Sequence, residues 1–600
     1  MLGRRANDVT ILQELAALYE ARAEEKGWPR PGFSTEKIGG VVVLAEDGSV
    51  REIRSLMAPM APDIKGKMQP RAMSVPTLSR TSGIKPGIFW DKTAYSLCVT
   101  ETPEGPGQGK RTAQEHDAFK AAHLKLLEEV DDPALIALRR FCETWAPERF
   151  ADHPDAAALV DANMVFRLGD GRFLHELPSA QALLATTGEG SVMCLVTGRP
   201  GQVRESHPAI KGVMGAQSSG ARLVSFNNSA ETSHSKEKGD NAPVSETAAF
   251  AYGTALNALL AKGSGNHLRI GGDTVAFWAD QPEVEWTIDA MFAGTDDAAV
   301  ERELRDRLQA VAEGRAPQGG YLDPDARLFV LGLAPNAARL AVRYWHPGRL
   351  GRFARAVTRF WADMAIAPSP FVKSGVDLSP KPLKLLRDVA VRREIEHIPA
   401  GLGGDLMRAI LTGGRYPVTW LAAVMGRIRV EGEPDAKAGK VDGRRAAVIA
   451  AVLRRNYEQE VPMALDEGAR DTAYLLGRLF GAYVYAEKSY QERGAGLRQK
   501  YMGSASATPA RVFPVLMRGY EHNLSSLRKA GGMKAGAGVK ADRAVAAIMD
   551  GLEDEMPATL PLEAQGRFFI GFYHQISAFY AKAEDAADAL IDTEDEGEDA

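Results

Sequence analysis

Apolar and polar residues follow two different periods along this chain of 600 residues. In the first part, short apolar runs alternate with turn residues; one run at 41–44 is followed by Asp47, Gly48 and an alternating return to residue 54. This order predicts a β-hairpin. After about residue 366, apolar residues recur every three or four positions, which predicts amphipathic helices. The pattern therefore predicts an α+β protein, with a mixed α/β region at 1–365 and an all-helical bundle at 366–582.

The same two periods predict the remaining elements. Further strands are expected at 87–100, 163–176, 190–197, 274–278 and 328–333. An N-terminal helix with Leu12, Leu15 and Leu18 on one face is followed by helices at 113–127 and 133–145. In the bundle, helices are expected at 383–396, 404–412, 418–428, 444–457, 471–493, 510–529, 541–553 and 562–582. The stretch 57–85 and the glycine-rich stretch from residue 531 are predicted to be loops.

The formal net charge of −5 hides an uneven distribution. Nine acids and no base lie between residues 584 and 600, so the rest of the chain carries +4. The segment 583–600 is therefore predicted to be an acidic disordered tail. Its simplest role is to solubilise the chain; competition with nucleic acid for a basic surface is the second interpretation.

Few residues suggest catalysis. The chain has no nucleotide phosphate loop, no metalloprotease motif, no zinc spacing and no nucleophile elbow, so we expect no catalytic or metal-binding residues, no cofactor and no enzyme. The pair His116 and Asp117 is predicted to lie on the surface turn of a helix. The three widely spaced cysteines are expected to be buried thiols. No signal peptide or membrane span is predicted, which favours the cytoplasm.

Two basic stretches favour a polyanionic partner. Between residues 51 and 92, eight bases face three acids, and the candidate phosphate contacts are Lys65, Lys67, Arg71, Arg80 and Lys85. Between residues 339 and 359, six arginines occur with no acid and with interleaved aromatic residues. The candidates there are Arg339, Arg343, Arg352, Arg355 and Arg359, of which the last three share one face at helical spacing. Each stretch alone could be a solvated basic surface, but two in one chain favour nucleic acid.

A glycine-rich segment at 212–220 and the asparagines after it form a third candidate. Gln217, Ser218, Ser219, Asn227 and Asn228 offer neutral donors and acceptors beside glycines that allow close backbone approach. The alternative is a tight turn into an apolar strand at 223–226.

Several segments of the chain resemble one known family. AQSSGARLVSFNNSAETSHSKEKGDNAPVSETAAFAYGTAL at 216–256 and LGLAPNAARLAVR at 331–343 are similar to signature segments of the large-subunit family of type I-C CRISPR Cascade, and RTSGIKPGIFWDKTAYSL at 80–97 and KYMGSASATPARVFP at 500–514 also match. The resemblance extends over nearly the whole chain and adds Asn241 to the candidate nucleic-acid contacts.

The resemblance implies a protein that functions by binding. Its expected partners are the 5′ end of a CRISPR RNA, duplex target DNA and its displaced strand, Cas backbone and RNA-processing subunits, helical small subunits and the Cas helicase-nuclease. It would recognise the protospacer-adjacent motif and promote R-loop formation. Residues 463–582 resemble a Cascade small subunit, for which Met463 and Met502 are candidate internal starts. The alternatives are a CRISPR nuclease with an unrecognised site and a helical scaffold that binds no nucleic acid.

Overall fold

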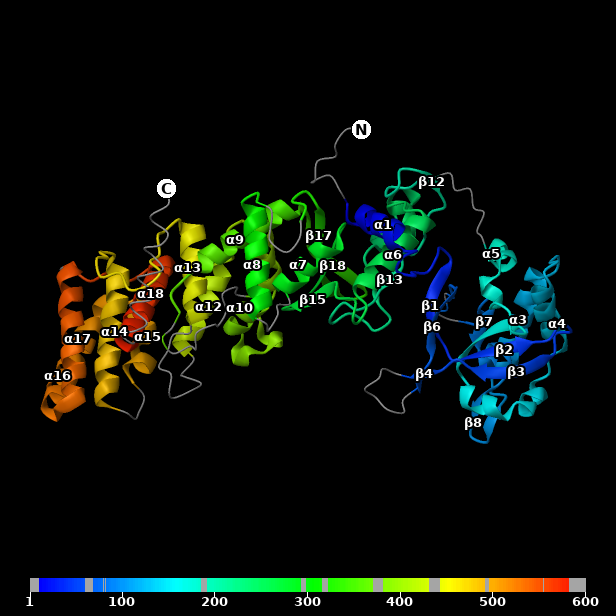
Figure 1. The fold of residues 1–600 in the computed structure, drawn as a ribbon, viewed down its shortest axis with the longest axis horizontal. Helices are drawn as coiled ribbons and strands as arrows, with labels where there is room; N and C mark the ends of the chain where they lie inside the picture. The colour runs from blue at the N-terminus through cyan, green and yellow to red at the C-terminus, as the bar shows by residue number, and fades with distance from the viewer. Residues whose placement is uncertain are drawn as a thin grey trace. The chain divides into compact units, whose positions relative to one another are not determined.

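The computed structural model describes residues 10–59, 68–78, 80, 83–184, 192–292, 298–315, 322–368, 370, 381–430, 443–491, 496–553 and 555–581. The candidates Lys65 and Lys67 and the acidic tail lie outside these residues. The chain divides into two compact units, and Figure 1 labels many of their elements. The N-terminal unit comprises Val9–Ile210 and Arg222–Ala258; the C-terminal unit comprises Met1–Asp8, Lys211–Ala221 and Leu259–Ala600.

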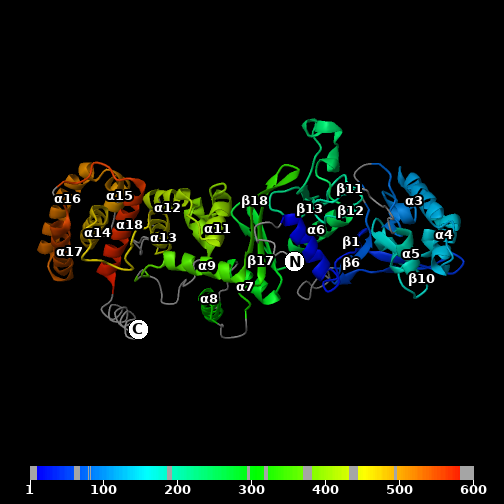
Figure 2. The same ribbon diagram turned by 90° about the horizontal axis from the view of Figure 1, so that it is seen from above.

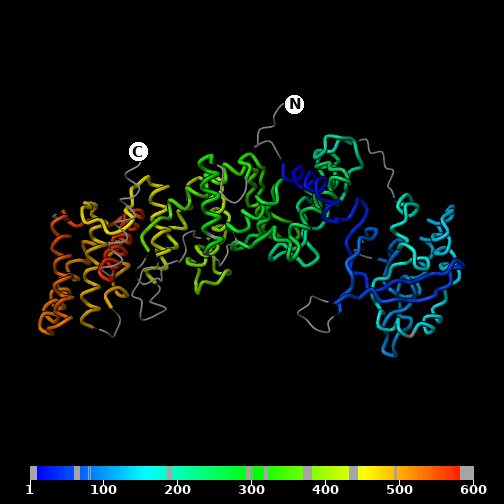
Figure 3. Tube along the Cα trace, viewed as in Figure 1, coloured from blue at the N-terminus to red at the C-terminus, as the bar shows by residue number. Residues whose placement is uncertain are grey.

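A four-stranded sheet organises the N-terminal unit. Its order is β3 (Val50–Ser55), β2 (Gly40–Leu44), β10 (Asn163–Leu168) and β7 (Trp90–Lys92), and only the β10–β2 pair is parallel. The β2–β3 hairpin is confirmed, and its path can be followed in Figure 3. Gly48 adopts φ +86° at the turn, a conformation that favours glycine, and the Ser49 amide donates to Asp47 Oδ1 at 2.9 Å.

Both faces of β2 are buried, because alternate residues enter different cores. Val42 and Leu44 join the core under α3 (Thr112–Leu126) and α4 (Pro133–Thr144), the two helices predicted there. Val41 and Val43 join a smaller core with Met73 on β6 (Arg71–Pro76). This explains why the strand is a continuous apolar run rather than an alternating one.

One buried histidine ties α3 to the segment before β7. His123 Nδ1 donates to the Phe119 carbonyl at 2.8 Å, and its Nε2 accepts from the Phe89 amide at 2.9 Å. Both bonds suit the neutral ring only, since a protonated ring has no acceptor. Burial lowers the pKa of His123 to about 4 from its usual 6.5.

Acidification is therefore expected to destabilise the protein between pH 6.5 and about 4. In this window the unfolded histidine binds a proton that the folded one excludes, so stability falls by up to about 1.4 kcal/mol per pH unit for this group. Urea unfolding at pH 7, 6 and 5 measures the slope. His123→Gln keeps an acceptor but does not titrate, so its slope should be shallower; equal slopes would contradict the assignment.

The other elements of the N-terminal unit are short. They are α1 (Ile11–Arg22), β1 (Phe33–Ile38), β4 (Ala58–Pro59), β5 (Met68–Gln69), β6 (Arg71–Pro76), α2 (Thr93–Ser96), β8 (Thr100–Thr102), β9 (Gly105–Gly107), η1 (Pro147–Asp152), η2 (Pro154–Leu159), η3 (Leu174–Glu176), α5 (Pro178–Leu184), β11 (Val192–Met193), β12 (Pro200–Gly201), β13 (Ala209–Ile210), η4 (Ser229–Glu231), η5 (Ser233–Ser235) and η6 (Lys238–Asn241). The helix α6 (Glu246–Leu259) ends this unit, and β14 (Ala221–Arg222) lies at the boundary.

Several predictions for this unit are wrong. The loop expected over 57–85 contains β6, which pairs with β1 because Met73 and Val75 bury alternate side chains. The strand expected over 87–100 shortens to β7 and is followed by α2. The strand expected at 223–226 is absent from this fully described stretch, and α6 was not predicted. His116 is buried rather than on the surface, with Nδ1 2.7 Å from the Tyr95 carbonyl.

An antiparallel sheet begins the C-terminal unit. Four of its strands run in the order β18 (Arg339–Arg349), β17 (Arg327–Asn336), β16 (Asp273–Ala279) and β15 (His267–Ile270). The predicted strands at 274–278 and 328–333 are confirmed as β16 and β17. One face, with Phe277 and Val330, packs in the same core as α7 (Pro282–Phe292), α8 (Ala298–Ala312) and α9 (Leu350–Met364).

Helices make up the rest of this unit. They are α10 (Pro382–Val389), α11 (Leu402–Thr412), α12 (Val418–Val430), α13 (Gly443–Tyr457), α14 (Thr472–Tyr490), α15 (Leu497–Ala507), α16 (Pro509–Ala530), α17 (Gly532–Gly551) and α18 (Leu562–Tyr580), with the 3₁₀ turns η7 (Val391–Arg393) and η8 (Ile395–His397). The predicted α+β class, with a helical second part, is confirmed. One core runs from Val357 and Phe360 in α9 through Leu385 in α10 to α18. The predicted division of the chain at residue 366 stays a prediction.

Three predictions for the helices need correction. The helix expected over 383–396 ends at Val389, and Arg392 and Arg393 adopt φ +55° and +58°. The helix α15 was not predicted. The glycine-rich stretch from residue 531 is not a loop, since α17 begins at Gly532; a Cβ at Gly538 would lie 3.2 Å from Leu527 Cβ, so a small residue permits close packing on α16.

The predictions for the cysteines hold. Cys98, Cys142 and Cys194 are free and buried. Burial raises the pKa of Cys142 to about 12, as expected of a thiol that serves as a small apolar residue. Within the described part of the chain, no helix combines the length and apolarity needed to cross a membrane.

Candidate nucleic-acid interface

The helix α9 carries the clearest basic surface. Phe353, Val357 and Phe360 enter the core. On the opposite side, Arg352, Arg355 and Arg359 are exposed at the predicted helical spacing. Figure 2 shows α9 along one side of the helices α11, α12 and α13. The amphipathic pattern thus places three guanidinium groups on the solvent face of one rigid element.

The only acid of α9 is already engaged inside the protein. Asp363 Oδ2 lies 2.5 Å from Arg455 Nε and accepts from the Tyr416 hydroxyl at 2.9 Å. Among the residues that the structure describes, no acid pairs with Arg352, Arg355 or Arg359. The arginine face of α9 therefore keeps its positive charge.

This charge acts on a neighbouring side chain. Burial lowers the pKa of His346, and the nearby Arg352 lowers it further. The ring therefore stays neutral at physiological pH and adds no charge to the surface.

The two remaining candidates of this stretch, Arg339 and Arg343, lie on β18. Contacts within the protein partly engage them. Arg343 Nε lies 3.6 Å from Asp273 Oδ1, and the Arg343 carbonyl accepts from Arg408 at 2.9 Å. Burial raises the pKa of Asp273, while Arg343 opposes this shift. Arg339 is half-buried on the same strand. The arginine stretch at 339–359 is thus divided between a strand and a helix rather than forming one basic helix.

The polar candidates separate between the two units. Gln217, Ser218 and Ser219 are exposed on a turn of the C-terminal unit, which Gly220 closes by donating to the Gln217 carbonyl at 2.8 Å. Asn227, Asn228 and Asn241 belong to the N-terminal unit.

Local hydrogen bonds engage all three asparagines. The Ser225 hydroxyl donates to Asn227 Oδ1 at 3.2 Å. Asn228 caps η4 together with Glu231, and Asn241 Nδ2 donates to the Lys238 carbonyl at 3.2 Å. Their amides therefore stabilise the backbone of their own segment.

The basic stretch of the N-terminal unit contains one structural arginine. Arg80 Nη2 lies 2.6 Å from the buried Asp91, its Nε donates to the Lys85 carbonyl at 2.8 Å, and its guanidinium stacks 3.9 Å from the Tyr95 ring centroid. Arg80 thus holds the segment before β7 in place. Arg71 and Lys85 are exposed.

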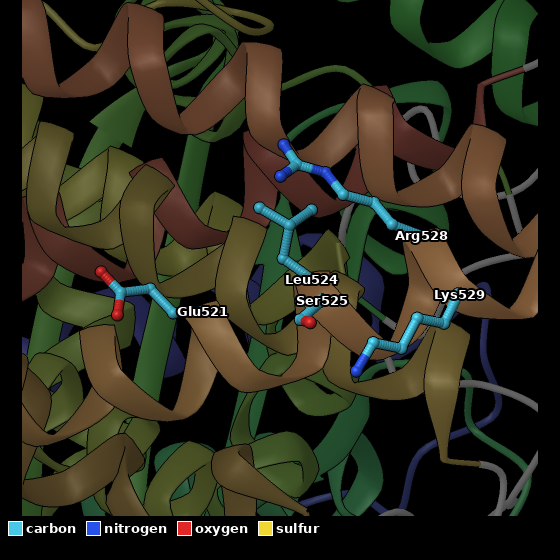
Figure 4. A pocket seen from close by; sticks show the side chains of 5 residues that line it. All are labelled: Glu521, Leu524, Ser525, Arg528 and Lys529. Atoms are coloured by element: carbon cyan, nitrogen blue, oxygen red, sulfur yellow. The ribbon is translucent and has the colours of Figure 1, made fainter.

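The described residues offer little for catalysis. None of them forms a group of three or more histidine, cysteine, aspartate or glutamate residues able to hold a metal ion. A hollow of about 430 Å³ on α16 is lined by Glu521, Leu524, Ser525, Arg528 and Lys529 (Figure 4). Arg528 pairs with Asp542 at 2.8 Å, and the lining holds one carboxylate and no histidine, so it lacks a nucleophile with its base.

A second basic helix face escaped the sequence predictions. Arg511, Arg518 and Lys529 are exposed along one side of α16. Their spacing of seven and eleven residues was visible in the sequence. The bases of α16 lie farther apart in the sequence than the arginines at 339–359. For that reason this face was not predicted from the sequence.

Comparison with known families identifies the class of this protein. A family model described as CRISPR-associated protein (Cas_Csd1) matches residues 15–580. The chain is therefore a CRISPR-associated protein. It belongs to the Cas_Csd1 family, because the match covers nearly its whole length. No match was found among curated proteins.

Proposed function

We propose that this chain is the large subunit of a type I-C CRISPR surveillance complex and acts by binding rather than by catalysis. The observation that carries the proposal is the arginine face of α9: three exposed guanidinium groups on one helix whose only acid is paired with Arg455. Guanidinium groups bind phosphates through paired hydrogen bonds and suit a nucleic-acid backbone. Membership of the Cas_Csd1 family supports the CRISPR context.

In this proposal the chain contacts the 5′ end of the CRISPR RNA and neighbouring Cas subunits. It recognises the protospacer-adjacent motif in duplex DNA, promotes R-loop formation and recruits the helicase-nuclease. Base pairing with the guide selects the target, so the protein needs to recognise only a short motif and the shape and charge of the backbone. The exposed turn with Gln217 is the proposed motif contact, and the arginine face of α9 is the proposed phosphate contact.

Neutralising the arginine face should lower the salt dependence of DNA binding. The variant Arg352→Ala/Arg355→Ala/Arg359→Ala should reduce the slope of log K against log salt by up to about 2.7, since each lost phosphate contact removes roughly 0.9. Gel shifts of the reconstituted complex across a salt series measure the slope. The matched control replaces the same residues by lysine, which keeps the charges and should keep most of the slope.

The same assay tests the function as a whole. Binding that depends on the motif should disappear when the chain is omitted from the complex. Binding indifferent to the chain would overturn the proposed function, whereas an unchanged slope in the alanine variant would remove only α9 from the interface.

The two candidate starts of a separate small subunit would give products with different sets of helices. Met463 is exposed in the loop before α14, so a product from this residue keeps α14 to α18 together. A product from Met502 loses α14, whose Phe480 packs against Phe568 and Phe572 of α18 at centroid distances of 5.8 and 5.7 Å.

We expect residues 463–600 to unfold cooperatively and residues 502–600 to lack a cooperative transition. Without α14, the apolar face of α18 would be left in water. Circular dichroism during thermal unfolding of both products measures this difference. Similar cooperative transitions would contradict the expectation that α18 needs its contact with α14 to fold cooperatively.

A further inference from the structure

The helices α16 and α17 lie at one end of the helical part of the C-terminal unit (Figures 1 and 2). Together they carry seven bases and three acids. Of the acids, Asp542 is engaged by Arg528 at 2.8 Å and by the Tyr520 hydroxyl at 3.3 Å.

One face of α16 concentrates this charge. Arg511, Arg518 and Lys529 are exposed and recur at intervals that return to the same side of a helix, with His522 and Ser525 between them. Among the described residues, no acid pairs with these three cations. The acid of α16, Glu521, lies about 80° around the helix from Lys529 and lines the same hollow as Lys529 (Figure 4). The basic face of α16, defined by Arg511, Arg518 and Lys529, thus extends for roughly 27 Å.

The end of the described chain lies close to this pair of helices. Lys540 of α17 donates to the Phe579 carbonyl in the last turn of α18 at 2.8 Å, and its ammonium lies 5.7 Å from the Phe579 ring centroid. The nine acids at 584–599 follow directly. A chain of this length can span up to about 60 Å, whereas neighbouring helix axes lie about 8–10 Å apart, so these acids can reach α16.

We propose that the acidic segment 584–599 binds the basic face of α16. The carboxylates offset three cations that pair with no acid among the residues that the structure describes. The covalent connection also gives the segment a high effective concentration at this face. The ligand is thus an acidic peptide supplied by the chain itself. As a consequence, the segment competes with other polyanions for α16. This inference does not depend on the proposed function.

A peptide-binding experiment without nucleic acid tests the proposal. The probe is a fluorescent peptide of residues 583–600, and the proteins are the full chain and a full chain whose nine tail acids are replaced by their amides. Fluorescence anisotropy at low salt should show at least ~10-fold tighter peptide binding to the amide variant, because its own tail no longer occupies the site. Equal affinities would overturn the proposal.

Charge reversals locate the site. In the amide background, Arg511→Glu/Arg518→Glu/Lys529→Glu should weaken peptide binding by at least ~10-fold. The control Lys110→Glu/Arg149→Glu/Arg199→Glu changes the net charge equally at three other exposed bases and should alter peptide binding by less than about 2-fold. Equal losses would show that the peptide follows net charge and would overturn the assignment to α16. All substituted residues are exposed, so unchanged melting temperatures verify that the fold is intact.

A parallel titration with homopolymeric single-stranded DNA tests whether the basic face of α16 binds nucleic acid instead of the acidic segment. Binding of this DNA to α16 with no peptide binding would identify the face as a nucleic-acid site and would also overturn the proposal. A further outcome is that the peptide binds as expected while the reconstituted complex shows no motif-dependent DNA binding in the gel shift. That combination would support the contact between the acidic segment and α16 and would contradict only the proposed function.

Discussion

Replacing Gly477 by alanine is expected to destabilise the helical bundle by about 3 kcal/mol, as overpacking of a rigid core does. Gly477 lies on α14 where this helix meets α18. A Cβ at this position would overlap the carbonyl oxygen of Phe568, which is backbone and cannot rotate away. Gly571 of α18 makes the reciprocal contact with the Tyr474 carbonyl, so the two helices approach through a pair of glycines. The added methyl group must separate these helices.

Matched glycine substitutions separate this steric effect from helix propensity. Gly503 in α15 and Gly519 in α16 have no atom within 4 Å of a Cβ added at either position. Alanine there should stabilise the protein by about 0.5–1 kcal/mol, because alanine has the higher helix propensity. Urea unfolding of the three variants measures the differences. A Gly477→Ala variant as stable as Gly503→Ala would show that α14 and α18 do not approach so closely.

These glycines show what periodicity predicts and what it omits. The apolar spacing around Leu476 and Phe480 predicted a helix at 471–493, and α14 is that helix. The same spacing does not reveal that α18 lies against α14. In α17 the glycines weaken the helix signal although packing on α16 stabilises the helix. Local patterns therefore predict most elements, but long-range pairing decides where intrinsic propensity is overridden.

The basic stretches show the same limit at the level of the site. Helical spacing correctly placed Arg352, Arg355 and Arg359 on one face, because a helix face follows from sequence separation alone. Which charges remain available depends on contacts that are distant in sequence. Asp363 is paired by Arg455, whereas Arg80 is used to hold Asp91. Counting bases and acids along the chain cannot distinguish a charge on the surface from one engaged in the interior.

The ion pair between Arg455 and Asp363 leads to the second large prediction. The side chain of Arg455 is 2% exposed and that of Asp363 is 13% exposed. Arg455→Met should cost about 3–5 kcal/mol, because removing one partner of a buried pair leaves the other charge uncompensated. The guanidinium also stacks 4.2 Å from the Tyr416 ring centroid, which keeps this tyrosine in contact with the pair. Urea unfolding of the variant measures the loss.

The double variant Arg455→Met/Asp363→Asn provides the control. It removes both charges while the asparagine oxygen can still accept from the Tyr416 hydroxyl, so it should recover more than half of the lost stability. The single variant should also weaken phosphate binding by α9, because Asp363 and Arg359 are four residues apart on this helix and a released carboxylate would offset one arginine. Equal stability of the single and double variants would contradict the explanation that Arg455→Met destabilises the protein by leaving the Asp363 carboxylate without a compensating charge. In that case the loss would come from the packing of Arg455 on Tyr416.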